Sequence, residues 1–149
     1  MSTMKLHRRT LVRALIASGA LGVIAACTTM ADSPNTQRIA LLPGNEVPAV
    51  NSQATGTATI TIKDDRSVVA AVSVSGMTAT ASHIHEAAMG TNGPVIVPFV
   101  KSGDNTFING PDAKLTEAQY AAYKAGRLYV NVHSAAFPGG EVRGQLKAN

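Results

Sequence analysis

Short runs in which apolar residues alternate with others, separated by turn-forming residues, dominate the sequence after residue 38. The clearest run is Ser67–Ser75, where valine or alanine occupies every second position and Gly76 follows. Because successive side chains of a β-strand point to opposite faces, this run places one set of apolar side chains on a single face. The pattern predicts strands that each bury one face in a core, and it disfavours a helical fold.

Six further segments have the same strand character. They are Ile39–Leu42, Ala54–Ile62, Ala81–His85, Pro94–Val100, Arg127–His133 and Glu141–Lys147. Leu115–Lys124 instead has a helical composition, with Gly126 as a suitable stop, and residues 101–111 are expected to form a loop. Strands at this spacing predict an all-β protein: an antiparallel Greek-key β-sandwich or barrel with one short helix in a connecting loop.

The first 27 residues have the composition of an export signal and are left out of the fold prediction. Four basic residues precede the apolar run Leu15–Ala26, which is shorter than the ~20 residues that a membrane-spanning helix needs. Ile24–Cys27 resembles the lipobox of bacterial lipoproteins, and His7–Arg13 resembles a twin-arginine export signal. A buried free cysteine is the alternative for Cys27.

The lipobox resemblance implies three parts of the chain. Residues 1–27 form a lipoprotein signal peptide, with Cys27 lipidated as the first mature residue. Residues 28–38 form a small, polar, flexible tether, and residues 39–148 form the domain. The protein is then exported and lipid-anchored to the cell envelope, on the periplasmic side or in the outer membrane. Its partner is the membrane, reached through the lipid, and no protein partner is identified.

The charge of the chain changes once the signal is set aside. Four of the 13 lysines and arginines lie in residues 1–27, which leaves nine against nine acidic residues. A near-neutral domain with few aromatic residues has no basic patch for nucleic acid. Glu141 and Arg143 are expected to form a surface ion pair or to anchor a loop. Cys27 is the sole cysteine, so the domain depends on its core for stability.

Three histidines lie in two of the predicted strands. His83 and His85 belong to Ala81–His85, and His133 ends Arg127–His133. Residues two apart in a strand share a face, with Cα atoms roughly 6.5–7 Å apart, so His83 and His85 project together. With the second strand nearby, His133 completes a three-imidazole site. Imidazole is a good ligand for copper and zinc, and its neutral form prevails at neutral pH.

The three histidines are therefore candidate ligands of one metal ion. Copper is favoured because nitrogen sites bind it most tightly in the divalent series, and zinc is the alternative. Each imidazole also needs a partner for its second nitrogen, and Glu86, Asn131 and Asp104 are the candidates. The alternation places the histidines outside the core, under the loops Glu86–Gly93 and Ser102–Pro111.

Several stretches together resemble the chordin-type (CHRD) domain family. They are Leu42–Pro48, Ala54–Ala58, His83–His85, Asn92–Val95, Gly126–Ser134 and Pro138–Leu146, in family order. The resemblance covers roughly Ile39–Leu146 and implies a β-sandwich domain of the kind found in animal extracellular and secreted bacterial proteins. His83–Glu86 is also similar to the His-Val-His-Glu motif of copper-zinc superoxide dismutase, which implies a metal on the His-x-His pair.

Two other functions stay open beside metal holding or delivery. The histidines can be structural residues that tie loops to strands, which leaves a surface interaction module. A dismutase-like enzyme is a third reading, but such a site uses more histidines and an aspartate, and three histidines remain after His7 departs with the signal. Ser82 and Ser134 point away from their neighbouring histidines, so neither is a triad serine. No catalytic residue is predicted.

Overall fold

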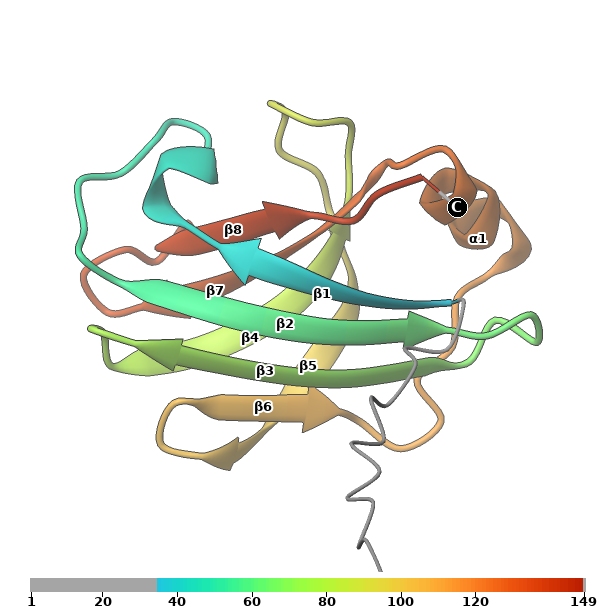
Figure 1. The fold of residues 1–149 in the computed structure, drawn as a ribbon, viewed down its shortest axis with the longest axis horizontal. Coiled ribbons are helices and arrows are strands. Elements are labelled where there is room, and N and C mark those ends of the chain that lie inside the picture. The colour runs from blue at the N-terminus through green and yellow to red at the C-terminus, as the bar shows by residue number, and fades with distance from the viewer. Residues whose placement is uncertain (1–34, 149) are drawn as a thin grey trace, which may run out of the picture. The chain divides into compact units, whose positions relative to one another are not determined.

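The computed structural model describes residues 35–148, which form eight strands and one α-helix (Figure 1). The strands are β1 (Thr36–Leu41), β2 (Thr55–Ile62), β3 (Val68–Ser75), β4 (Ala79–Glu86), β5 (Val95–Gly103), β6 (Thr106–Asn109), β7 (Leu128–Ser134) and β8 (Val142–Gln145). A 3-10 helix, η1 (Pro43–Asn45), follows β1, and α1 (Glu117–Lys124) precedes β7. The expected signal peptide with Cys27, and residues 28–34 of the expected tether, lie outside the described residues.

The strands form one antiparallel sheet in the order β1-β2-β3-β6-β5-β4-β7-β8. Consecutive strands β4, β5 and β6 return the chain to the side of β3, which is a Greek-key arrangement. The two outer strands meet just beyond β1, where Leu42 and Arg143 exchange backbone hydrogen bonds of 3.0 and 3.1 Å. The sheet thus curls into a nearly closed barrel, and the predicted all-β class with one short helix is confirmed.

The core fills the inside of the barrel with the apolar faces of the strands. In β3, Val68, Ala70, Val72 and Val74 are buried while the residues between them are exposed, as the alternation predicts. The other large core side chains are Ile60, Ile62, Ile84, Phe107, Leu128, Val130, Val132, Val142 and Leu146. Each buried aliphatic or aromatic side chain contributes about 1.5–3 kcal/mol, so this core stabilises a domain that lacks a disulfide.

The structure corrects two element boundaries. Residues 101–111 were expected to form a loop, but they contain the end of β5 and all of β6. The turn residues at 103–105 mask this hairpin in the sequence, and Phe107 is the one fully buried apolar residue of β6. The first strand begins at Thr36, so residues 36–38 of the expected tether belong to the sheet. Gln37 joins that strand to the chain end by exchanging two hydrogen bonds with the backbone of Lys147.

The single α-helix of residues 35–148 closes one end of the barrel. It starts at Glu117 because Thr116 and Gln119 form a reciprocal capping box, and it ends before Gly126, whose φ of 68° lies in the left-handed region that favours glycine. Tyr123 is buried against the core. No helix in this part of the chain is long and apolar enough to cross a membrane.

Strands β7 and β8 depart from the alternation, because they are buried on both faces. Tyr129 and Asn131 of β7 and Arg143 of β8 point outward, yet each is at most 2 % exposed. Loops cover this outer face: Arg143 donates to the Thr91 carbonyl, and Asn45 donates to the Arg143 carbonyl. The outer face of β4, β7 and β8 therefore carries a buried polar cluster, which is separate from the apolar core inside the barrel.

Candidate metal site

The three histidines meet on this covered outer face. His83 and His85 come from β4, and His133 comes from β7, which pairs directly with β4 so that Ala81 lies opposite His133. Ile84, between the two β4 histidines, is fully buried in the core. The alternation of the strands thus positions all three imidazoles on the side away from the core, as predicted from the sequence.

The imidazoles converge closely. One ring nitrogen from each histidine lies within 4.8 Å of the others, and His83 Nδ1 is 3.1 Å from His133 Nε2. The ring centroids are 4.9–6.2 Å apart, and the rings are inclined to one another by 41–81°. Two nitrogens that share an ion at about 2.0–2.1 Å lie at most about 4.2 Å apart, so side-chain shifts of about 1 Å suffice to bind one ion.

Backbone carbonyls fix which nitrogen each ring presents. His85 Nδ1 donates to the carbonyl of Gly93 at 2.9 Å, and His133 Nδ1 donates to the carbonyl of Pro138 at 3.0 Å. Since a carbonyl only accepts, both rings carry their proton on Nδ1, and their Nε2 atoms are unprotonated. In metal sites, a ligating histidine usually donates its other N–H in this way. The lone pair of His133 Nε2 accepts from His83 Nδ1; to bind a metal through Nδ1, His83 would have to carry its proton on Nε2 instead.

His85 Nε2 is the most informative atom of the site. The His85 side chain is 8 % exposed, and its Nε2 makes no hydrogen bond of standard geometry with the described residues, although the Asn131 side chain lies close enough to raise the His85 pKa. A buried polar atom without a partner costs about 1–3 kcal/mol, so native structures rarely tolerate one without a function. Here the unpartnered lone pair belongs to one of three imidazoles whose ring nitrogens converge, which is what a metal ligand requires.

The surroundings keep all three imidazoles neutral. Burial lowers the pKa of His83 to about 4, and repulsion from His133 and His85 adds to this effect. Burial also lowers the pKa of His133, against the hydrogen bond to Pro138. For His85, burial is again the largest cause and lowers the pKa; Gly93 and Asn131 raise it, whereas His133 and Arg143 lower it. Neutral rings at pH 7 offer three lone pairs to a metal without first losing protons.

The three residues expected to support the histidines are placed differently from one another. Asn131 is buried beside the site, opposite His83 in the β4–β7 pairing, and its Oδ1 has no partner within residues 35–148. Asp104 is exposed in the turn between β5 and β6. Glu86 bonds through its backbone N–H to Pro94. Within the described chain, the second nitrogens of His85 and His133 meet main-chain carbonyls, and neither carboxylate bonds to a histidine.

The loops over the site also differ in part from the expectation. The loop after β4 does cover it, because it supplies the Gly93 carbonyl that holds His85. The expected second cover, Ser102–Pro111, contains the β5–β6 hairpin and makes no hydrogen bond to the histidines in the described structure. Its place is taken by the loop between β7 and β8, which supplies the Pro138 carbonyl to His133.

A stack of three planar groups extends from the site, and the sequence did not reveal it. The Tyr129 ring lies parallel to His85, with centroids 4.7 Å apart and an 8° tilt. The Arg143 guanidinium lies 3.4 Å from the Tyr129 centroid. Arg143 is only 2 % exposed and donates to Asn92 Oδ1 and to the Thr91 carbonyl. The expected surface ion pair with Glu141 does not form: Arg143 is a buried loop anchor, and Glu141 accepts from Ser52.

Glu46 is the acidic residue that accompanies Arg143. It lies after η1, is 6 % exposed, and has an unpartnered Oε1 within the described residues. Burial raises its pKa to about 7, although the charge of Arg143 and a hydrogen bond with Asn131 lower it. The sequence did contain a signal for this cluster. Glu46 lies within Leu42–Pro48 and Arg143 within Pro138–Leu146, and both of these stretches resemble the same family.

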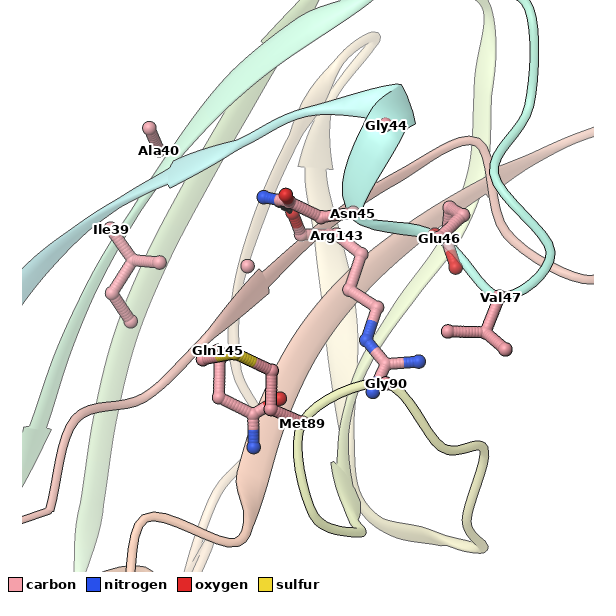
Figure 2. Close-up of a pocket in the computed structure, with 11 residues that line it drawn as sticks. Ile39, Ala40, Gly44, Asn45, Glu46, Val47, Met89, Gly90, Arg143 and Gln145 are labelled. Carbon is pink, nitrogen blue, oxygen red and sulfur yellow. Dashed lines mark hydrogen bonds between the residues drawn. The ribbon is translucent and has the colours of Figure 1, made fainter.

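A cleft of about 450 Å³ lies next to the stack, between η1, β8 and the loop after β4 (Figure 2). Figure 2 shows the Arg143 side chain reaching toward Gly90, with Met89 and Gln145 on the other side of the cleft. The three histidines are not among its lining residues. Arg143 is thus the residue that the cleft and the histidine stack share.

Gly93 holds the loop and the site together, which leads to a first prediction. Its carbonyl accepts from His85, and its N–H donates to the Tyr129 hydroxyl at 3.3 Å. A β-carbon at Gly93 would collide with the backbone carbonyl of Glu86, so Gly93→Ala is expected to destabilise the domain by about 3 kcal/mol, the upper end for overpacking. Urea unfolding measures this loss, with Gly139→Ala, which enters open space, as the control. Equal stability of the two variants would contradict this role.

Comparison with known proteins confirms the family resemblance. The family model of the CHRD domain matches residues 38–146. No curated protein and no solved structure gives a significant match to the chain. The matched region includes every strand from β2 to β8, both histidine-bearing strands among them. Since the match spans well over half of its 149 residues, this chain belongs to the CHRD domain family.

Proposed function

We propose that this CHRD domain binds one copper ion through His83, His85 and His133, and that it holds or delivers copper at the cell envelope. The observation that carries the proposal is the buried, unpartnered Nε2 of His85 beside two further imidazole nitrogens. In the metal-free domain this atom makes no hydrogen bond of standard geometry, whereas a metal ion held by the three imidazoles would engage its lone pair.

Copper is preferred over zinc on chemical grounds. Three imidazoles suit both metals, and affinity at nitrogen sites peaks at copper in the divalent series. His83 and His133 are both partly exposed, so one side of the bound ion faces solvent or a partner. The apolar core already holds the domain together, and an ion on the outer face is not needed for folding. An accessible ion outside the core suits holding and transfer.

Titration of the purified, untagged domain with copper and zinc tests the proposal. We expect one equivalent of copper to bind with sub-micromolar affinity and to protect the protein against thermal unfolding, because ligands that bind only the folded state stabilise it. Zinc is expected to bind more weakly. A domain that takes up neither metal at micromolar concentration would leave the histidines as structural residues.

Copper affinity should start to fall at a lower pH than it does for a site made of ordinary histidines. An ordinary histidine, with a pKa of about 6.5, begins to lose metal to protons as the pH falls through that value. The pKa of His83 is lowered to about 4, and those of His85 and His133 are lowered too. Affinity should therefore begin to fall only at a pH below the one at which an ordinary histidine site loses its metal, and the His83 ring should stay available until the pH approaches about 4.

The same lowered pKa values affect the stability of the metal-free domain. Between pH 6.5 and 4 the unfolded histidines bind protons that the folded ones do not, so the free energy of unfolding should decrease as the pH falls through this range. Copper titrations and urea unfolding at a series of pH values measure both effects. A copper affinity that already declines between pH 7 and pH 6 would contradict the buried, neutral site.

The proposal includes the lipid anchor, with the membrane as the partner that it reaches. Support comes from the lipobox-like Ile24–Cys27 and from the short distance to the domain: eight residues separate Cys27 from β1. Such a segment spans at most roughly 26–29 Å, which keeps the domain close to the membrane surface. In bacterial cells that express the full chain, Cys27→Ser should move the protein from the membrane fraction to the soluble periplasmic fraction, while Thr28→Ala should not. An unchanged distribution would remove the anchor from the proposal.

A further inference from the structure

The charge around the three imidazoles carries one inference beyond metal binding. All three donors are neutral nitrogens, and no aspartate or glutamate belongs to the group of converging ligands. The one permanent charge beside these neutral rings is that of Arg143, which stacks on Tyr129 next to His85 and disfavours added positive charge. A cation that enters therefore meets no compensating anion.

Arg143 adds a fixed positive charge close to the site. A single aromatic ring, Tyr129, separates its guanidinium from the imidazole of His85. Glu46 is buried, and among the described residues it bonds to Asn131 rather than to a histidine; because its pKa is raised to about 7, it offsets the charge of Arg143 only in part at neutral pH. Because Arg143 is 2 % exposed, solvent screens its charge less than it screens a surface arginine.

We infer that the site selects Cu(I) over Cu(II), so that the domain takes up and releases copper in the reduced form. This inference rests on the proposed copper site. Three neutral donors beside a buried cation fit a singly charged ion that accepts three ligands. Cu(II) carries one charge more and prefers a tetragonal arrangement with four equatorial ligands, of which three imidazoles leave one unfilled.

The size of the effect follows from Coulomb's law. At an effective dielectric constant of about 20, a positive charge about 10 Å from the site lowers the affinity for a metal ion by roughly tenfold for each unit of charge that the ion carries. Cu(II) is therefore disfavoured relative to Cu(I) by roughly tenfold. The coordination preference acts in the same direction. We therefore expect Cu(I) to bind at least about 100-fold more tightly than Cu(II), which raises the potential of the bound couple by about 118 mV over that of the aqueous couple at 59 mV per tenfold.

The test measures both affinities on the wild-type domain. Cu(I) is titrated without oxygen against bicinchoninate, and Cu(II) is titrated in air against nitrilotriacetate. Arg143→Gln removes the buried charge and should lower the Cu(I)/Cu(II) affinity ratio by roughly tenfold. Arg127→Gln removes an exposed arginine at the start of β7 and should leave the ratio unchanged.

The titrations test separately the preference for Cu(I), the copper site itself and the role of Arg143. Cu(II) binding as tightly as Cu(I), or more tightly, overturns the inference and leaves the copper site intact. Binding of neither form removes the copper site itself. A ratio unchanged in a folded Arg143→Gln domain overturns the part of the inference that assigns the preference to Arg143. Should this variant not fold, the wild-type ratio still decides.

Discussion

His85→Ala is expected to abolish stoichiometric copper binding. Loss of an outer partner of a metal ligand typically costs about 10–100-fold in affinity, and loss of one of three ligands should exceed the upper end of that range. His85 supplies the one buried ring nitrogen that has no other partner in the described structure. Two imidazoles from different strands then remain, one of them already bonded to the other.

Copper titration monitored by competition with a chromophoric chelator measures this loss, and the fold has to be checked alongside it. His85 stacks on Tyr129, so His85→Ala can also lower stability. His133→Ala, at a partly exposed position, provides the second test, and far-UV dichroism shows whether each variant keeps its strands. Asp104→Ala is the matched control in an exposed turn. Wild-type affinity in either histidine variant would contradict the three-histidine site.

Arg143→Gln is expected to lower the free energy of unfolding by about 3–5 kcal/mol, because two hydrogen bonds from a charged donor are lost, each contributing about 1.5–3 kcal/mol. The substitution leaves the Thr91 carbonyl and the Asn92 side chain without their donor. It also leaves Glu46 buried without its cation, and it uncovers one face of Tyr129. A small domain is stable by only about 5–15 kcal/mol, so this loss is a large part of the total.

Thermal unfolding measures the effect of Arg143→Gln as a fall in Tm of about 10–20 °C. Arg127→Gln serves again as the control, because substitutions at exposed sites usually change stability by less than about 0.5 kcal/mol. If the Arg143 variant unfolds at the wild-type temperature, Arg143 is not the anchor of the loop after β4, and the polar cluster does not contribute to the fold as the structure indicates.

The fold and the convergence of the three histidines could be predicted from the sequence, because both follow from the two-residue period of β-strands. Alternation in Ser67–Ser75 predicts which side chains of β3 are buried, and the same rule places His83 and His85 on one face. Convergence with His133 required one further assumption, that its strand pairs with β4, and the structure confirms it. The burial pattern of β3 and the shared face of His83 and His85 are properties of single strands, and the position of His133 depends only on the pairing of β4 with β7.

The remainder of the site was not accessible in this way. The groups that orient His85 and His133 are main-chain carbonyls of Gly93 and Pro138, which no side chain marks in the sequence. Tyr129, Arg143 and Glu46 come from three separate segments, and their burial depends on loops that fold over the outer face. Outward-pointing residues of an antiparallel strand are normally solvated, so the sequence left a surface ion pair open for Arg143 beside the role of loop anchor that it has in the structure. Strand β6 was missed because only Phe107 marks its buried face.

X-ray absorption spectroscopy of the copper-loaded domain tests most directly whether three imidazoles share one ion. The structure predicts three nitrogen ligands at about 2.0–2.1 Å, together with the outer-shell scattering of imidazole rings. That pattern should lose one ring in His133→Ala if this variant retains any copper. A loaded protein whose spectrum shows oxygen ligands only, or no imidazole scattering, would place the ion elsewhere and contradict the site.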